Sequence, residues 1–398
     1  MNGRSLEGMV NVREIQEALR REGLDGWLFF DHHQRDPLAY RVLGFMPARH
    51  VTRRWYYFIP AQGEPAGLVH RIEAGMLDAV PGEKTKYSSW TEQTGGIKKL
   101  LGSAKRVAMQ YSPQCAIPYV AMVDAGTVEL VRGQGVEVVS SAELIQHFEA
   151  RCSPAAFESH LEAGRRVDRV RGEAFRMIGE RTRNGGSVQE LEVKNFVRDG
   201  FVKAGMVVED GPIVGVNANA ANPHYEPFEA TTQPIRAGDF VLLDMWAKLD
   251  QPGSVYYDIT WTGFCGANPP EEMRKVFAIV REARDRAIER VQKALRAGET
   301  VRGFEVDDAA RGYISSQGYG EFFVHRTGHS IGQDVHGNGA NMDNLETHDE
   351  RRIVPWTCFS IEPGIYLEKF GVRSEINLFV EERDARVTGE MQKELVLI

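Results

Sequence analysis

The sequence predicts a chain of two domains, an α/β domain over residues 1–153 followed by a domain with segregated helices and hairpins (α+β) over residues 154–398. At 398 residues, of which 42% are hydrophobic, the chain is too long for one compact core of ordinary size. Strand-like runs alternate with helical segments in the first part. The second part opens with a long helical segment and contains two acid-bearing hairpins.

The first domain is expected to begin with an amphipathic helix near residues 11–22, followed by the apolar strand GWLFF at 26–30. Further strand-like runs, each before a turn or a helical segment, are RWYYFIP (54–60), RVAMQY (106–111) and VEVVSS (136–141). This alternation predicts an α/β domain. For His32 and His33, which follow the first strand, we expect a polar loop.

The second domain is expected to begin with a long helix that extends to residue 182. Ser153 is suited to the N-cap and Pro154 to the first turn. A second helix is expected to open with a capping box formed by Ser187 and Glu190.

The first acid-bearing hairpin covers residues 240–264, in which two runs of β-branched and aromatic residues flank a Gln-Pro-Gly turn. If the strands pair symmetrically about Gln251, Asp244 lies opposite Asp258, with Cβ atoms roughly 4.5–5.5 Å apart. Two facing carboxylates repel each other. Such a pair is stable only if one acid is protonated or a cation lies between them.

The second hairpin covers residues 358–380, and in it Glu362 and Glu375 mirror each other about the turn at 367–371. Each of the four acids, taken alone, is compatible with a solvated strand face. Two hairpins with the same arrangement favour a shared site. Carboxylate oxygens joined by one imidazole suit Mn²⁺, Co²⁺, Zn²⁺ or Fe²⁺.

The imidazole comes from the run VHRTGHSIGQDVHG at 324–337, in which His325, His329 and His336 are spaced by four and seven residues. Gly328 and Gly332 argue against a regular helix, so we expect this segment to turn around the site.

In order along the chain, Asp…Asp, His-x3-His-x6-His, Ile-Glu-Pro-Gly and Arg-Ser-Glu resemble the pita-bread metallopeptidases, the family of methionine aminopeptidase, aminopeptidase P, prolidase and creatinase. The similarity covers residues 155–398, and the preceding part resembles the N-terminal domain of creatinase and prolidase. The resemblance implies a creatinase-like α/β domain followed by a pita-bread catalytic domain. It also implies two divalent metal ions, with manganese preferred and cobalt, zinc or iron as alternatives.

The resemblance assigns a role to each ligand. It implies that Asp244 binds one metal, that His329 and Glu362 bind the other, and that Asp258 and Glu375 bridge both. A water held between two such metals has a pKa near neutrality, and Glu362 is placed to take its second proton.

The remaining implied roles concern the substrate. His224 and His336 match the histidines that contact the substrate carbonyl and the tetrahedral intermediate, although His224 is also compatible with a plain surface loop. His325 matches the histidine that lines the proline side of the pocket. Arg373 and Thr260 match residues beside the ligand carboxylates.

The chain departs from the family pattern at the first hairpin. Where relatives have Gly two residues after the first aspartate, this chain has Trp246. Asp244 and Asp258 are 14 residues apart, three more than in most relatives, and the extra residues fall at the tip, 250–254. We expect Trp246 to crowd a neighbouring group.

The length of the substrate is the least determined property. The arginine that holds a dipeptide's carboxylate in some prolidases aligns with His348, and Arg351 and Arg352 lie close by in the sequence. These three residues are the candidates for binding a free carboxylate.

The residues therefore favour an enzyme that hydrolyses the peptide bond before proline, acting on Xaa-Pro dipeptides. Aminopeptidase P activity on longer peptides is the close alternative. Creatinase-like C–N hydrolysis without metal and a peptide-binding module without catalysis are further alternatives, and the complete ligand set argues against both.

Composition limits the partners and the location. The net charge is −8 with acids and bases interspersed, so we expect no basic face for nucleic acid or an anionic membrane. Four scattered cysteines fit a reducing cytoplasm, and residues 1–23 lack the apolar core of a signal peptide. The resemblance also implies a homodimer, in which the aromatic and basic stretch 50–57 could close over the partner's site.

Overall fold

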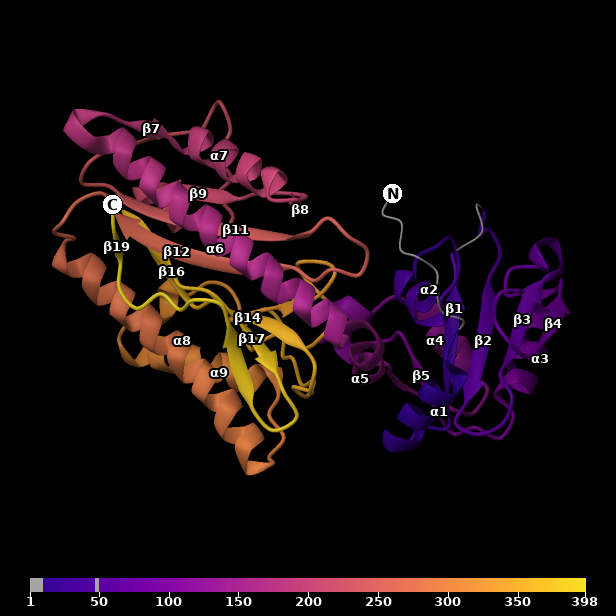
Figure 1. Cartoon of the computed structure of the whole chain (residues 1–398). Coiled ribbons are helices and arrows are strands. Elements are labelled where there is room, and N and C mark those ends of the chain that lie inside the picture. Colours follow the sequence, from indigo (N-terminus) through magenta and orange to yellow (C-terminus); the bar gives the residue numbers. More distant parts are fainter. Residues whose placement is uncertain (1–9, 47–49) are drawn as a thin grey trace. The chain divides into compact units, whose positions relative to one another are not determined.

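The computed structural model describes residues 10–46 and 50–398, and the chain divides into two compact units, Met1–Glu149 and Ala150–Ile398 (Figure 1). The expected boundary at 153/154 falls among the first residues of the second unit. Within the described residues, no helix combines the length and the apolarity needed to cross a bilayer. The expectation about a signal peptide concerns residues 1–23, of which 1–9 lie outside the described part.

The first unit is built on a mixed sheet. Its main elements are α1 (Val12–Arg21), β1 (Gly26–Asp31), α2 (Pro37–Leu43), β2 (Trp55–Pro60), β3 (Ala66–His70), β4 (Glu83–Tyr87), α3 (Trp90–Leu101), β5 (Arg106–Met109), α4 (Ala125–Arg132), β6 (Glu137–Ser140) and α5 (Ala142–Ile145). In the described residues the sheet has six strands in the order β4-β3-β2-β1-β5-β6, and β2 is antiparallel to both of its neighbours. The predicted helix and strands of this region are confirmed.

Both faces of this sheet are buried, which explains the nearly continuous apolar sequence of β1. Trp27 and Phe29 point to one face, where they pack with residues of α1 and α2, and Leu28 and Phe30 point to the other, with residues of α3 and α4. After β1 the chain turns around Asp31, whose carboxylate accepts hydrogen bonds from three backbone N–H groups of the following loop. His32 and His33 lie in this loop, as expected.

The second unit, all of whose residues are described, carries the long helices and the hairpins. Its main elements are α6 (Pro154–Thr182), β7 (Val188–Gln189), α7 (Glu190–Lys203), β8 (Met206–Val207), β9 (Ile213–Val216), β10 (Pro234–Ile235), β11 (Phe240–Leu249), β12 (Tyr257–Phe264), α8 (Glu271–Ala297), α9 (Gly303–Ser316), β13 (Ser330–Ile331), β14 (Cys358–Ile361), β15 (Gly364–Leu367), β16 (Phe370–Arg373), β17 (Ile376–Val380), β18 (Ala385–Thr388) and β19 (Val396–Leu397). Helices α6 and α7 pack against β9, β11 and β12, and α8 and α9 cover β14 to β17 (Figure 1).

Helix α6 begins where the sequence predicts. The Ser153 side chain accepts a hydrogen bond from the backbone N–H of Ala156 at 3.1 Å, and Pro154 occupies the first turn. Pro fits there because the first N–H groups of a helix have no partner within the helix.

The predicted capping box of α7 is wrong. Ser187 makes no capping bond, because Val188 and Gln189 pair with β10 as strand β7 and the helix begins only at Glu190. The buried Glu190 carboxylate instead accepts hydrogen bonds from the backbone N–H of Val216 at 2.7 Å and from other groups around it. Its role is therefore to join α7 to the loops beside it.

Strands β11 and β12 form the first predicted hairpin, but their register differs from symmetry about Gln251. Asp244 pairs with Thr260 and Asp258 pairs with Trp246, so the two aspartates are diagonal neighbours rather than opposite each other. The shift amounts to two residues, and side chains in a strand alternate with a period of two. Both carboxylates therefore remain on the same face of the hairpin.

The shift arises in the connection between the strands. The Val255 N–H donates to the Ser159 hydroxyl at 3.1 Å and the Tyr256 N–H to the Gly332 carbonyl at 2.9 Å. These residues therefore bond to other segments instead of continuing the ladder, and β12 begins only at Tyr257.

The register of the second hairpin is confirmed. Ile361 pairs with Ile376 in β14 and β17, and Gly364 pairs with Arg373 in β15 and β16. Glu362 and Glu375 lie in the gap between these two ladders, where the same register places them across from each other. The hairpin can therefore turn both carboxylates toward one site.

A buried histidine joins α6 to the hairpins. His160 is fully buried, its Nδ1 lies 2.6 Å from the Tyr256 carbonyl oxygen, and its Nε2 lies 2.7 Å from the Thr388 hydroxyl. A neutral imidazole satisfies both partners, with Nδ1–H donating to the carbonyl and the hydroxyl donating to Nε2. Burial lowers the pKa of His160 to about 4, from an ordinary value of 6.5.

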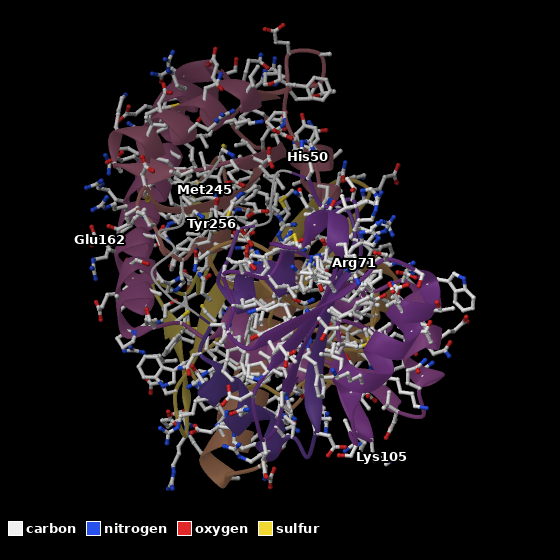
Figure 2. All side chains as sticks on the ribbon, turned by 90° about the vertical axis from the view of Figure 1, so that its right-hand side faces the viewer. His50, Arg71, Lys105, Glu162, Met245 and Tyr256 are labelled. Carbon is white, nitrogen blue, oxygen red and sulfur yellow. The ribbon has the colours of Figure 1, made fainter. Side chains whose placement is uncertain are left out.

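This depressed pKa predicts an acid-dependent loss of stability. As the pH falls from 7 to 5, His160 takes up a proton in the unfolded chain but not in the folded protein, so folding loses about 2 kcal/mol. Urea unfolding at pH 7 and pH 5 should therefore show a smaller acid loss for His160→Gln than for the wild type. Replacing exposed His50, labelled in Figure 2, by Gln is the control. Equal acid losses in wild type and His160→Gln would contradict this account.

Candidate metal centre

Three of the predicted ligands form a compact cluster. Asp258, His329 and Glu375 each present one ligand atom, these atoms lie within 4.8 Å of one another, and all three residues are buried. They come from β12, from the residue before β13 and from the residue before β17. Segments far apart in the sequence therefore meet at one point.

Glu362 adjoins the cluster through His329. The His329 Nε2 lies 3.4 Å from a Glu362 oxygen and 3.5 Å from an Asp258 oxygen. Its Nδ1 lies 3.2 Å from the Ser330 carbonyl oxygen. Nε2 is therefore the nitrogen that can bind a metal.

Asp244, the fifth predicted ligand, is held through Arg373. The buried Arg373 guanidinium donates from Nη2 to Asp244 and from Nε to the Thr260 hydroxyl at 3.0 Å. Thr260 in turn donates to Glu375 at 2.7 Å. Arg373 and Thr260 therefore fix the orientation of two candidate ligand carboxylates.

The backbone at Gly328 explains how His329 reaches this position. A Cβ added at Gly328 would lie 1.9 Å from the Ser360 carbonyl oxygen, so only glycine permits this approach of the chain to β14. The Ser360 hydroxyl accepts from the His329 N–H at 2.9 Å and lies 3.0 Å from a Glu362 oxygen. Ser360 was not predicted, since a serine in a strand is not distinctive in the sequence.

The buried acids perturb one another. Burial raises the pKa of Asp244 to about 7, although Arg373 opposes the shift, and burial also raises the pKa of Asp258. The pKa of Glu375 lies well above its usual range because of burial and the charges of Asp258 and Glu362. Without a cation these groups therefore retain protons, which a bound divalent cation would replace.

One atom shows directly that the residues fit such a cation. Asp258 Oδ1 is buried and has no hydrogen-bond partner among the described residues. An oxygen without a partner in a buried site is costly unless something else occupies its lone pairs. The surrounding set of carboxylates and one imidazole matches the ligands of Mn²⁺, Fe²⁺, Co²⁺ or Zn²⁺.

Two of the predicted substrate histidines lie at the accessible side of this cluster. The ring of His336 packs at 89° against the ring of His329, with centroids 4.4 Å apart, and His336 is solvent-exposed. His224 is also exposed, and it lies close enough to His336 for its charge to lower the pKa of that residue. Both can therefore meet a ligand that enters from solvent.

His325 is bonded through both of its ring nitrogens. Its Nδ1 lies 2.7 Å from the Arg326 carbonyl oxygen, and its Nε2 lies 2.6 Å from the hydroxyl of Tyr366, which accepts from Arg373 at 2.9 Å. Burial lowers the pKa of His325 to about 4, so the ring is neutral. A hydrogen-bonded chain thus runs from Asp244 through Arg373 and Tyr366 to His325. Tyr366 was not predicted, because no motif in the sequence marks it.

The three candidates for binding a free carboxylate differ in their surroundings. Arg351 is buried and makes a bidentate contact with Asp349, at 2.9 and 2.6 Å. His348 is exposed, and its Nδ1 lies 2.7 Å from an Asn344 oxygen. Arg352 is half-buried. The structure therefore leaves His348 more accessible than Arg351.

A further arginine that was not predicted lies near the centre. Arg326 is half-buried and directly follows His325. Its positive charge acts to lower the pKa values of His329, His336 and Glu362. Its position within the histidine-rich run was the available signal. Arg326 thus joins the candidates for binding an anionic group.

The crowding expected at Trp246 is present. A Cβ added at Gly211 would lie 2.4 Å from the Trp246 ring, so the indole packs directly on the Gly211 backbone. Trp246 pairs with Asp258 in the hairpin, so its half-buried ring lies beside the candidate ligands.

A comparison with known protein families shows to which family the chain belongs. The sequence pattern of metallopeptidase family M24 matches residues 158–382. The chain belongs to this family. Membership implies bound divalent metal ions, in agreement with the buried cluster of acids and histidine.

Similarity to curated proteins is consistent with this membership. The chain is 32% identical to the Xaa-Pro dipeptidase of Lactobacillus delbrueckii subsp. lactis over 223 residues, which are 55% of this chain and 55% of that protein. It is 25% identical to the probable dipeptidase PepE of Mycobacterium bovis over 347 residues, which are 85% and 84% of the two chains. The chain spans about half the length of the first of these relatives.

Solved structures share the fold over the whole chain. The dipeptidase PepE from Mycobacterium ulcerans superposes with a TM-score of 0.67 and 24% identity, covering 97% of this chain and 96% of that one. A prolidase from Thermococcus sibiricus gives a TM-score of 0.61 and 26% identity, with 97% and 98% covered. The predicted fold, an α/β domain followed by a pita-bread domain, is confirmed.

The arrangement of the carboxylates predicts different metal losses in single variants. Asp258 and Glu375 belong to the compact cluster, whereas Asp244 is bonded to Arg373, so Asp258→Asn and Glu375→Gln should each lose more metal than Asp244→Asn. If Asp258 and Glu375 bridge two metals, Asp244→Asn should retain about one metal per chain. Elemental analysis after dialysis measures the content.

The matched control is Asp343→Asn, which alters a buried aspartate whose carboxylate accepts hydrogen bonds from backbone N–H groups and which is not a member of the cluster. Its metal content per folded protein should equal that of the wild type. Equal loss of metal in the Asp244, Asp258 and Glu375 variants would show that the bridging assignment is wrong.

Proposed function

We propose that this enzyme hydrolyses the peptide bond before proline and that its preferred substrates are Xaa-Pro dipeptides. The observation that carries the proposal is the buried cluster of Asp258, His329 and Glu375, with Glu362 and Asp244 beside it and His336 at its accessible side. Relatives named Xaa-Pro dipeptidase support the choice of substrate.

The proposal assigns the metals to five residues. Asp244 would hold one ion, His329 and Glu362 the other, and Asp258 and Glu375 both. When bound, the ions supply a water that loses a proton near neutral pH. Manganese is our choice among the ions that this ligand set accepts, and cobalt, zinc and iron are the alternatives.

The protein's own groups have distinct tasks in this proposal. Glu362, whose pKa is lowered by His329 and its other cationic neighbours despite burial, is an ionised base that can accept a proton. In this proposal, His336 and His224 stabilise the negative charge that develops on the carbonyl oxygen. Neutral His325, held by Tyr366, presents its ring as a wall for the residue after the scissile bond.

The close alternative is an aminopeptidase P, which would release the first residue from longer Xaa-Pro peptides. A relative in Mycoplasma pneumoniae carries the name putative Xaa-Pro aminopeptidase. We favour the dipeptidase because Arg326 lies close enough to the centre for its charge to act on His329, His336 and Glu362. A free substrate carboxylate needs such a partner.

We further propose that the enzyme is a cytoplasmic homodimer. Four free thiols agree with a reducing compartment. The dimer rests on the family resemblance, and analytical ultracentrifugation tests it.

The proposed roles of the histidines predict two separable defects. His329→Ala should lose metal, because its Nε2 is directed at the cluster. His336→Ala should keep the metals and lower kcat by about 10²–10³, the effect of removing one donor to a developing oxyanion. Metal analysis and Xaa-Pro hydrolysis on the same samples separate these effects. If His336→Ala strips the metal and restoring the metal restores turnover, the two roles must be exchanged.

Substrate length is tested with a free and a blocked carboxylate. In a dipeptidase, His348→Ala or Arg326→Met should raise KM for a Xaa-Pro dipeptide about tenfold and leave an amidated Xaa-Pro analogue nearly unchanged. Exposed Arg13→Met, in α1, is the matched control. A wild-type enzyme that prefers Xaa-Pro-Yaa tripeptides, without dependence on a free carboxylate next to proline, would establish the aminopeptidase alternative.

A further inference from the structure

His224, one of the histidines of the proposed reaction, lies in a long connection rather than on a strand of the sheet. This connection, residues 217–233, runs from β9 to β10 and opens with the 3₁₀ helix Asn217–Ala221; we call it the His224 loop. The His224 side chain is exposed, and among the described residues no hydrogen bond holds its ring. The position of the imidazole therefore depends on how the backbone around it is held.

A buried carboxylate holds both ends of the His224 loop. Glu190, the first residue of α7, is fully buried. Its carboxylate accepts hydrogen bonds from the backbone N–H of Val216, just before the loop, and from that of Gln233, at its end, both at 2.7 Å. It also accepts from the side-chain amide of Asn219, at 3.0 and 3.1 Å. Glu190 thus closes the loop at its base.

The remaining donor to this carboxylate is the residue that follows His224. The Tyr225 hydroxyl donates to Glu190 at 2.7 Å, and the Tyr225 side chain is buried. One turn further along α7, the buried Lys194 bonds through its ammonium group to Glu226. Helix α7, which packs against β7 and β9 (Figure 1), therefore holds the C-terminal side of His224 at two consecutive residues.

The N-terminal side of His224 is fixed against β16, the strand that ends with Arg373. The Arg373 Nη1 donates to the Pro223 carbonyl oxygen at 3.4 Å. A Cβ added at Gly371 would lie 2.1 Å from the Ala220 carbonyl oxygen, so only glycine permits this approach of the loop to the strand. The residues on both sides of His224 are therefore held by neighbouring elements.

Hydrogen bonds to a buried carboxylate fix one arrangement of a loop. The donors around Glu190, together with the positive end of the α7 dipole, replace the water that this side chain loses on burial. Bonds to a charged acceptor are short and directional, whereas an apolar side chain at this position would fill space without fixing a direction. The arrangement that these bonds fix is the one that brings His224 near His336.

We propose that Glu190 and Tyr225 are positioning residues of the peptidase reaction, which hold His224 where it meets the substrate carbonyl oxygen. This inference rests on the role that the proposed function gives to His224. Both residues are buried and act through the backbone of the loop. A donor stabilises a developing charge only within hydrogen-bond distance, so a displacement of about 1 Å at His224 lowers the rate strongly.

A double-mutant cycle between Tyr225→Phe and His224→Ala tests the proposal. Tyr225→Phe removes only the hydroxyl and keeps the ring. Where His224 is present, this change should lower kcat for a Xaa-Pro dipeptide at least about tenfold, with little change in KM or metal content, since His224 acts on charge that develops in the transition state. In the His224→Ala background it should have no further effect on kcat, because the residue that it displaces is gone.

Glu190→Gln extends the cycle to the carboxylate itself. The amide keeps the size of the side chain but turns an NH₂ group toward donors, so the contacts of the loop are disrupted. The loss of kcat and its dependence on His224 should be the same as for the tyrosine. The matched control is Glu305→Gln, which alters a carboxylate in the first turn of α9 that accepts from the Arg302 N–H and pairs with Arg290, and its kcat should equal that of the wild type.

All values of kcat are taken per folded, metal-containing protein. Equal losses of kcat for Tyr225→Phe with and without His224, or an unchanged kcat for Tyr225→Phe, would overturn the inference and leave Glu190 and Tyr225 with a role in stability alone. Undiminished turnover of the single variant His224→Ala, or a wild type that hydrolyses no Xaa-Pro peptide, would instead overturn the proposed function, and the inference with it.

Discussion

Repulsion among buried carboxylates is the constraint on which the site depends. Asp258 and Glu375 are almost wholly buried within reach of each other, and one oxygen of Asp258 has no hydrogen-bond partner among the described residues. Burying such charges without compensation costs several kcal/mol. Hydrogen bonds from Arg373 to Asp244 and to Thr260, which in turn donates to Glu375, offset part of this cost. Arg373 also donates to Tyr366, which contacts His325. A divalent cation supplies the rest, so metal binding and the integrity of the centre are coupled.

The hairpins and their acids could be predicted because their pattern is local. Alternation with a period of two and a short turn determine which face each carboxylate occupies, and even the register error at Asp244 left the face unchanged, since the shift was two residues. The capping box at Ser187 failed for a tertiary reason: residues 188–189 pair with β10, a strand more than forty residues away. Ser360 and Tyr366 could not be predicted, because their importance lies in contacts between distant segments. Arg326 could have been found, since it lies within the histidine-rich run.

Trp246 stands where the family has glycine, and its side chain affects both the packing of the fold and the space beside the candidate ligands. The indole fits only because residue 211 is glycine, and it lies across the hairpin from Asp258. The indole therefore occupies space beside Asp258 that a glycine would leave open. The histidines define the rest of that side, with His336 exposed against His329 and His325 fixed by Tyr366.

The central claim is that the two acid-bearing hairpins and His329 together hold two metal ions. Crystals grown with Mn²⁺ and measured at a wavelength where manganese scatters anomalously test it most directly. The account predicts two anomalous peaks about 3.5–4 Å apart, with Asp258 and Glu375 in contact with both. A single peak, or no peak beside Asp258 in a crystal of active enzyme, would contradict it.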